Sequence, residues 1–186
     1  MRQDTLIVMA LVAMLCGCAA TREASAPADA RALEHVLEEW TLAWSSGDVA
    51  RVLRLYADDV YYEDVPFEVV RQGRGGVRDF ATSIFGAFSD VRFERKSRFV
   101  SADGRSGTIE WVWRGRQVKD FPRLPATNKP FEVRGVTIVQ FRDGLIVRNS
   151  NHWDLTLFLR QVGLQVSARP NPSAQDALAK QDLAHP

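Results

Sequence analysis

The hydrophobic pattern predicts two long helices in the first half of the chain. Apolar residues recur every three or four positions in both, which places them on one side of a helix. The first run ends at Ser45-Ser46-Gly47, and Asp48 is a candidate N-cap of a second, short helix that extends to Tyr56. The apolar positions of the two long runs are Leu33, Val36, Leu37, Trp40 and Trp44, then Val77, Phe80, Ile84, Phe85 and Phe88.

Alternating and β-branched runs predict strands in the rest of the chain. A short strand, Val60–Asp64, stops at Pro66, and Gly73–Gly76 indicates a loop before the second long helix. Asp143-Gly144 predicts a hairpin, because Gly best tolerates the positive φ that a type I′ turn needs. The later strands are residues 91–100, turned at Asp103-Gly104, residues 108–114, and the hairpin arms 131–141 and 145–154. Helices first and strands later predict an α+β domain.

The first 18 residues have the pattern of an export signal and are set aside from the fold. Arg2 precedes an apolar run over residues 6–15, and the box Leu15-Cys16-Gly17-Cys18 follows. This arrangement resembles a bacterial lipoprotein signal, which implies that Cys18 is lipidated and becomes the mature N-terminus. Ala19 in place of Asp implies, by the same resemblance, the outer membrane, with the protein facing the periplasm. An ordinary cleaved signal or an uncleaved anchor is the alternative, although the run is short for a spanning helix.

The remaining composition fits one domain at residues 30–165. Residues 19–29 are predicted to be a tether and residues 166–186 a disordered tail, because neither has an apolar face. A formal net charge of +1 argues against a nucleic-acid partner. Both cysteines lie in the signal, so we expect no disulfide, thiol nucleophile or Cys/His zinc site in the domain. The histidines form no cluster, and we expect no metal and no cofactor.

Several motifs occur in an order that resembles one family. They are Tyr56–Asp64 after a helix and Ser-Gly-Asp, then Gly73–Val77, Glu110–Gly115, Leu124–Lys129, the strand around Gly135, and His152-Trp153-Asp154 leading to Leu159–Leu164. Together they are similar to the SnoaL-like polyketide cyclase branch of the nuclear transport factor 2-like (NTF2-like) superfamily. The resemblance implies an NTF2-like cone, in which a curved antiparallel sheet wraps the N-terminal helices around one deep cavity.

Strand alternation assigns side chains to the two faces of this expected sheet. If the helices cover the concave face, the wall is mostly aromatic with a few polar groups, which is the balance of a small-molecule site. The candidate ligand-binding residues are Trp40, Tyr62, Trp111, Trp113, Thr137, Asn149, Asn151 and Trp153. Val136 and Ile138 fall on the convex face, where they predict a homodimer through the sheet; core packing is the alternative.

Asp64 is the sharpest catalytic candidate. A carboxylate that points into an aromatic cavity loses solvation, and its pKa rises toward values that suit proton transfer. Its position resembles that of the general base in the ketosteroid isomerases of the superfamily. Trp40 and Thr137, however, stand where those enzymes keep an oxyanion-binding Tyr and a second acid, which counts against isomerisation. The alternative is that Asp64 caps local backbone amides or pairs with Arg71 or Arg74.

Asp154 is the second catalytic candidate. In SnoaL-like cyclases an aspartate late in the last strand is the acid/base of ring closure, and the resemblance assigns that position to Asp154. The alternative is an N-cap, because apolar residues at helical spacing follow from Leu155. His152 faces away from Trp153 by alternation, so we expect it at the surface or rim.

Two classes of function follow from these observations. The first is an exported lipoprotein that binds a small apolar molecule in its cavity, with the membrane as a further partner through the lipid anchor. The second is a cofactor-independent isomerase or cyclase that moves a proton on a small carbonyl compound with Asp64 and Asp154. Fold alone does not separate them, because one superfamily holds both enzymes and binders.

Overall fold

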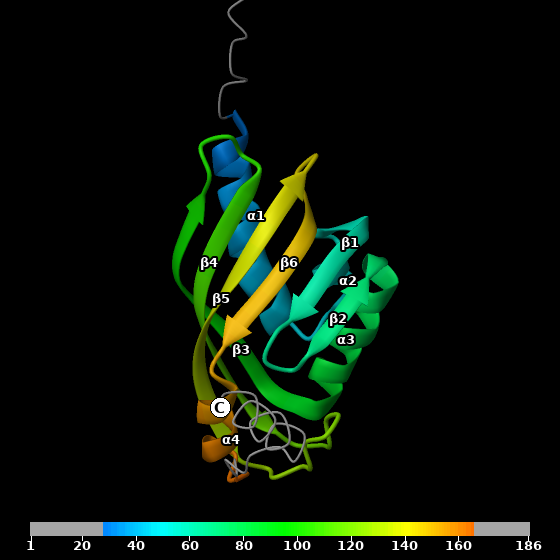
Figure 1. Ribbon diagram of the computed structural model, residues 1–186, viewed down its shortest axis with the longest axis vertical. Coiled ribbons are helices and arrows are strands. Elements are labelled where there is room, and N and C mark those ends of the chain that lie inside the picture. The colour runs from blue at the N-terminus through cyan, green and yellow to red at the C-terminus, as the bar shows by residue number, and fades with distance from the viewer. Residues whose placement is uncertain (1–27, 166–186) are drawn as a thin grey trace, which may run out of the picture.

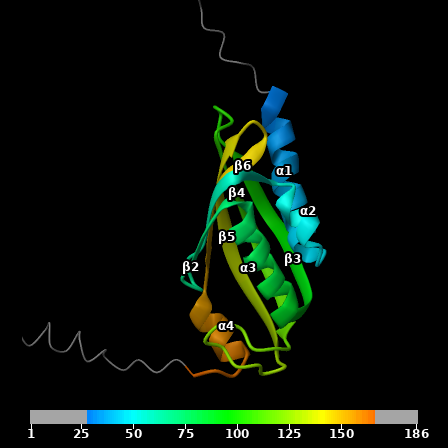
Figure 2. The ribbon, with the colours of Figure 1, turned by 90° about the vertical axis from the view of Figure 1, so that its right-hand side faces the viewer.

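Six strands form one curved sheet whose concave side is covered by helices (Figure 1, Figure 2). The computed structural model describes residues 28–165; the signal with Cys18, most of the tether and the tail lie outside them. The strands are β1 (Tyr56–Asp64), β2 (Val69–Gln72), β3 (Phe88–Val100), β4 (Ser106–Gln117), β5 (Pro130–Arg142) and β6 (Leu145–Trp153). The helices are α1 (Ala28–Ser45), α2 (Val49–Leu53), α3 (Gly73–Ala87) and α4 (Leu155–Gln161). The predicted α+β class is confirmed.

The sheet is mixed, which corrects the expectation of a wholly antiparallel one. Its strand order is β2-β1-β6-β5-β4-β3, and β1 runs parallel to β6, with Asp64 beside Asn151. The other neighbouring strands are antiparallel, and β5 places Thr137 opposite Asn151. Sequence signals for hairpins concern strands that follow each other in the chain, so they do not reveal the pairing of β1 with the distant β6. This pairing brings polar residues of three strands into one row.

The predicted hairpin of β5 and β6 is confirmed. Asp143 has φ 53° and Gly144 has φ 75°, so both central residues adopt the left-handed conformation that the Asp-Gly signal predicts. The alternation along the arms is also as expected. Val133, Thr137 and Val139 are buried, whereas Ile138 is 47% exposed.

Two predicted boundaries were wrong, and one strand was missed. β1 begins at Tyr56, so the short helix ends at Leu53, before the tyrosine that the prediction included. Gly73–Gly76 is the first turn of α3, not a loop, and β2 precedes it unpredicted. A Cβ on Gly76 would lie 2.9 Å from the Cβ of Arg71, so glycine here lets the helix start directly against β2.

Helix α1 places two tryptophans, Trp40 and Trp44, against the concave face of the sheet. On its other side, Glu38 accepts from Arg98 of β3 at 2.9 Å, which joins the helix to the edge strand. Among residues 28–165, no helix has the length and apolar character needed to cross a membrane.

Candidate functional site

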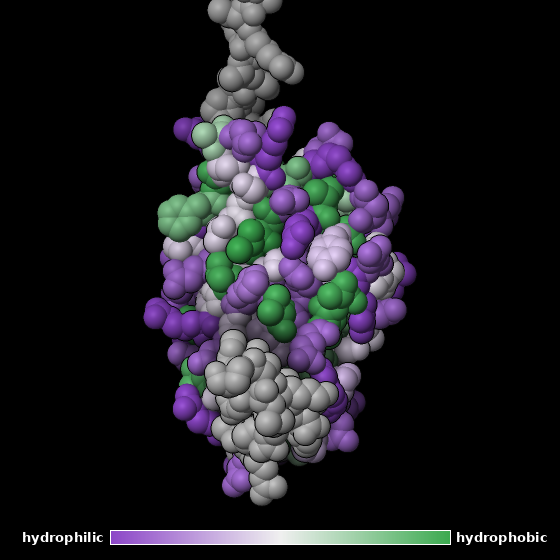
Figure 3. Space-filling model, viewed as in Figure 1, coloured by the Kyte–Doolittle hydropathy of each residue, from purple (hydrophilic) through white to green (hydrophobic). Residues whose placement is uncertain are grey.

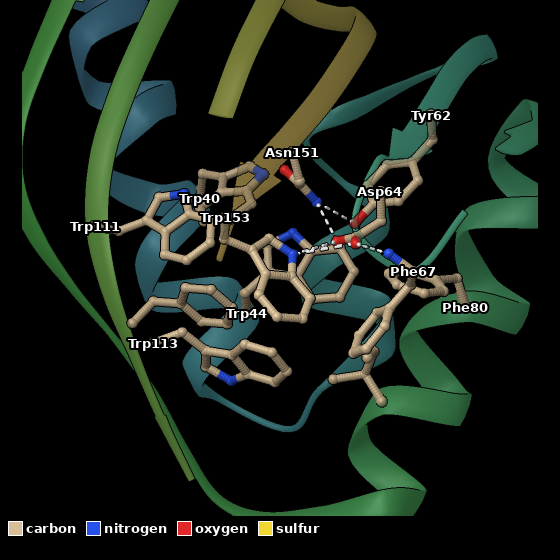
Figure 4. A pocket seen from close by; sticks show the side chains of 12 residues that line it. Trp40, Trp44, Tyr62, Asp64, Phe67, Phe80, Trp111, Trp113, Asn151 and Trp153 are labelled. Atoms are coloured by element: carbon tan, nitrogen blue, oxygen red, sulfur yellow. Dashed lines mark hydrogen bonds between the residues drawn. The ribbon is translucent and has the colours of Figure 1, made fainter. Parts of the chain in front are cut away.

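A small cavity lies between the helices and the concave face of the sheet (Figure 4). Its volume is about 20 Å³, enough for about one water molecule, because aromatic rings fill most of the interior. Nine of the twelve lining residues are aromatic, and they include all five tryptophans of the chain. The lining consists of Trp40, Trp44, Tyr62, Asp64, Phe67, Phe80, Ile84, Phe93, Trp111, Trp113, Asn151 and Trp153.

Asp64 is the one charged residue of this lining, and it is 5% exposed. Three neutral groups donate to its carboxylate: Trp153 Nε1 to Oδ1 at 3.1 Å, Asn151 Nδ2 to Oδ2 at 3.3 Å, and the Phe67 backbone N–H to Oδ1 at 3.2 Å. Figure 4 shows the three donors converging on it. Burial raises the pKa of Asp64 to about 6, and these hydrogen bonds oppose the rise by stabilising the carboxylate. Asp64 therefore changes charge near neutral pH.

Of the alternative roles for Asp64, local capping is observed and pairing with arginine is not. Its bond to the Phe67 N–H closes the turn between β1 and β2. Arg74 instead pairs with Asp58 at 2.5 Å, and Arg71 donates to the carbonyl oxygen of Val70. Within residues 28–165, no basic side chain lies within salt-bridge distance of Asp64.

A buried chain of hydrogen bonds runs along the concave face and ends at Asp64. The Tyr56 hydroxyl donates to Asn149 Oδ1 at 3.0 Å, and Asn149 Nδ2 donates to Asn151 Oδ1 at 2.9 Å. Asn151 Nδ2 then donates to the Tyr62 hydroxyl at 2.8 Å and to Asp64. The links from Tyr56 through Asn149 and Asn151 direct donors toward the carboxylate, whereas the bond to Tyr62 is a side branch, so the chain is polarised to stabilise a negative charge at Asp64.

The tryptophans present mainly ring surface to the cavity, because most of their N–H groups are used elsewhere. Trp40 and Trp44 both donate to the Tyr56 hydroxyl, at 2.9 and 3.2 Å, and Trp111 donates to Thr137 Oγ1 at 2.8 Å. Trp113 Nε1 is the exception: it is buried and has no hydrogen-bond partner among the described residues. The walls are therefore largely apolar apart from Asp64, Asn151, the Tyr62 hydroxyl and the Trp113 N–H.

The structure brings most of the predicted ligand-binding residues together. Trp40, Tyr62, Trp111, Trp113, Asn151 and Trp153 line the cavity with Asp64. Thr137 and Asn149 are buried as well, but they do not line it. Both bond to Asn151 Oδ1, so their role is to hold the Asn151 amide with its NH₂ group toward Asp64.

Asp154 and His152 lie outside the cavity lining. Asp154 Oδ1 accepts from the Leu157 N–H at 2.8 Å, which is the N-cap geometry of the alternative interpretation. His152 is exposed on the other face of the sheet, as alternation predicted, and its Nε2 lies 2.8 Å from Ser150 Oγ. In the described part of the chain, no three His, Cys, Asp or Glu side chains are grouped so that they could hold a metal ion.

Five lining residues were not among the predicted ones. They are Trp44, Phe67, Phe80, Ile84 and Phe93. The helical residues share the apolar face that the sequence analysis recognised, so Trp44, one turn after Trp40, could have been inferred from spacing. Phe67 lies in the turn after β1, where no periodic pattern indicates which way a side chain points.

Comparison with known proteins places the chain in a family. Residues 37–149 match the family model of the SnoaL-like domain, and the chain belongs to that family. Among curated proteins, no sequence matches this chain.

Solved structures share the fold at low sequence identity. A protein of ketosteroid isomerase-like fold from Catenulispora acidiphila, solved in complex with trimethylamine, has a TM-score of 0.63 and 21% identity, over 73% of this chain and 97% of that one. A proposed polyketide cyclase from Pseudomonas putida has a TM-score of 0.66 and 20% identity, over 70% and 98%. A proposed SnoaL-like polyketide cyclase from Jannaschia has a TM-score of 0.64 and 14% identity, over 75% and 94%. These similarities support the cone-shaped NTF2-like architecture.

Proposed function

We propose that this domain binds a small, largely apolar molecule in the cavity beside Asp64. The observation that carries the proposal is the composition of the lining, in which nine aromatic residues surround one buried carboxylate and one amide. Apolar area of this kind supplies affinity, and a few polar atoms fix the orientation of the guest. A neighbour of similar fold was solved in complex with trimethylamine, so a small organic molecule accompanies at least one protein of this fold.

Entry of a guest requires one aromatic side chain to move, because the cavity as it stands is no larger than a water molecule. Phe67 is the side chain in the best position. It lines both the cavity and an outer hollow of about 190 Å³, so it separates the two. Its turn is held to the loop before β5 by Arg123, which pairs with Glu68 at 2.8 Å and donates to the Phe67 carbonyl oxygen at 3.1 Å.

The test is mass spectrometry of small molecules that co-purify with the full chain. We expect a compound with the wild type that is lost in Trp111→Ala, because the Trp111 indole forms part of the wall. Phe99→Ala, which removes an aromatic ring that is 67% exposed, is the control and should retain the compound. Circular dichroism checks that each variant is folded. Equal recovery from all three proteins would contradict the proposal, and unfolding of Trp111→Ala would assign Trp111 to core packing.

Proton transfer on a small carbonyl compound is the alternative function, and the environment of Asp64 favours it. Burial raises the pKa of Asp64 to about 6, which suits a general base. Asp154 lies outside the lining, so this alternative rests on Asp64. The test is deuterium exchange into small ketones. The rate should rise with pH through about 6 and be lost in Asp64→Asn; exchange that is equal in the two proteins would exclude a role for Asp64.

We also propose a cellular localisation for the protein, on the basis of the sequence of its first 18 residues. A lipid on Cys18 would hold the domain on the periplasmic side of the bacterial outer membrane. Fractionation of cells that express the wild type and Cys18→Ser tests this. The wild type should sediment with the outer membrane and the variant should be released or remain unprocessed. Identical fractionation would overturn the anchor.

A second copy of the chain is the partner we propose for the outer face of the sheet. Figure 3 shows apolar side chains among the polar ones on this face. Ile138 is 47% exposed and Phe99 is 67% exposed, and a groove of about 430 Å³ lies beside Phe99 and Val136. Covering these side chains in a homodimer would remove them from water.

A further inference from the structure

The cavity contains an unbalanced negative charge. Asp64 is the one ionised lining residue at neutral pH, and no Lys, Arg or His belongs to the lining. Burial and the neighbouring Tyr56 and Asp64 keep the pKa of the other titratable lining residue, Tyr62, well above its ordinary value of 10, so Tyr62 remains neutral. Tyr56, the remaining titratable group that faces this network, is also held neutral by burial, which raises its pKa. A buried carboxylate without a counter-ion is costly, and proteins normally pair such charges.

The hydrogen-bond network favours the charged form of Asp64 over the neutral one. Its three partners, Trp153, Asn151 and the Phe67 backbone, all donate to the carboxylate. The chain from Tyr56 through Asn149 to Asn151 points in the same direction. These hydrogen bonds offset part of the cost of burying the charge, and burial outweighs them, so a counter-charge supplied from outside would stabilise the anion.

The remaining walls suit a cation that carries methyl groups. The face of an aromatic ring attracts a cation, most strongly for tryptophan, and methylated ammonium groups are held in such aromatic cages. The three donors already occupy much of the acceptor capacity of Asp64, so a guest with many N–H groups would leave them unsatisfied. Methyl groups need no acceptor and can contact the rings directly.

We propose that the guest of this cavity is a small methylated ammonium cation, held by Asp64 and the tryptophan rings. The inference rests on the proposed binding function and names the chemical class of its ligand. The cation takes the position beside Asp64, at the side of the cavity where Phe67 separates the cavity from the outer hollow.

Tryptophan fluorescence gives a direct readout, because all five tryptophans line the cavity. The full chain is titrated at neutral pH and constant ionic strength with tetramethylammonium, with sodium as the cation control and tert-butanol as a neutral compound of similar shape. We expect saturable binding of tetramethylammonium that is weakened about tenfold or more in Asp64→Asn. Asp58→Asn is the matched control: it lies on the same strand, its side chain is 86% exposed, and its affinity should change less than about twofold.

The pH dependence of binding provides a second test that needs no variant. Tetramethylammonium keeps its charge at every pH, so its affinity should rise roughly tenfold per pH unit as Asp64 ionises and become constant above a pH of about 6. The affinity of a neutral guest should stay constant or fall as the pH rises over the same range, because such a guest adds to the desolvation of the ionised carboxylate.

The outcomes separate this inference from the function on which it rests. Equal affinity for tert-butanol and tetramethylammonium, or binding that does not respond to Asp64→Asn and pH, overturns the cationic ligand and leaves the apolar binding site standing. If neither compound binds while a neutral compound co-purifies in a Trp111-dependent manner, the ammonium class is likewise wrong. Absence of any co-purifying compound, together with absence of binding, overturns both.

Discussion

At the residue scale, Asp64 combines two properties that seldom occur together: it is 5% exposed, and every group that donates to it is neutral. Its ordinary pKa is 3.8, and burial raises the pKa to about 6 in the folded protein. Between these pH values the folded state keeps a proton that the unfolded chain has released. The contribution of Asp64 to the free energy of unfolding therefore falls as the pH rises from about 4 to about 6, and this contribution remains lower above that range.

Asp64→Asn should remove this pH dependence. Relative to the variant, the wild type should lose about 2 kcal/mol of unfolding free energy between pH 4 and pH 6, most of the roughly 3 kcal/mol that corresponds to the full difference in pKa. Urea unfolding across this range measures it, with Asp58→Asn as the control that should follow the wild type. Parallel curves for wild type and Asp64→Asn would contradict a raised pKa.

The sequence was sufficient to predict Asp64 as a buried carboxylate, but not its surroundings. Alternation along β1 placed Val60, Tyr62 and Asp64 on one face, and all three are buried. The donors Asn151 and Trp153 come from β6, and Phe67 comes from a turn. Their approach depends on a parallel pairing between distant strands and on turn geometry, which local pattern does not encode.

At the scale of the elements, the register between β4 and β5 positions the wall of the cavity. Trp111 lies opposite Gly135, and an added Cβ at Gly135 would overlap the indole ring. The glycine therefore lets the tryptophan lie flat over the neighbouring strand. Strand alternation predicted that Trp111 faces the cavity, but the direct contact between its ring and the Gly135 backbone follows only from the observed register.

Gly135→Ala should destabilise the domain by about 1–3 kcal/mol and alter the tryptophan fluorescence, because the Trp111 ring must move. Gly86→Ala is the matched control. No atom lies within 4 Å of its added Cβ, and alanine favours a helix, so this variant should be more stable by up to about 1 kcal/mol. Urea unfolding compares the two. Similar effects of both substitutions would show that the close contact at Gly135 is unimportant.

The turns and helix ends show which local structures can be predicted from residue type alone. The hairpin at Asp143-Gly144 and the cap at Asp154 form as their residue types predict. Gly73–Gly76 does not form the loop that its residue types predict. A glycine-rich stretch usually indicates a turn, but here packing requires glycine inside a helix. The reason is the close approach of β2, a strand too short and exposed to be recognised from pattern.

At the scale of the whole molecule, the two faces of the sheet differ in what covers them. The concave face and the helices enclose the aromatic cavity, and the outer face carries apolar side chains in contact with water. The ordered motifs predicted this architecture well, because the family's sequence pattern extends over the whole sheet. The expected deep cavity was wrong: the observed one has a volume of about 20 Å³, because nine aromatic rings pack together and fill most of the interior.

Ile138→Glu should convert the proposed homodimer to a monomer, because it places a charge in the apolar outer face. Leu42→Glu is the control, since Leu42 has the same 47% exposure but lies on α1. Sedimentation velocity of the purified domain gives the oligomeric state. A dimer that survives Ile138→Glu, or a monomeric wild type, would overturn the proposed interface.

The proposed cation site depends on Asp64, whose buried carboxylate faces the cavity and responds to what enters it. Nuclear magnetic resonance of the ¹³C-labelled Asp64 carboxyl carbon, followed over pH with and without tetramethylammonium, tests this directly. We expect a midpoint near pH 6 in the empty protein and a lower midpoint when the cation is present. A midpoint near 3.8 that does not change when the cation is added would contradict this expectation.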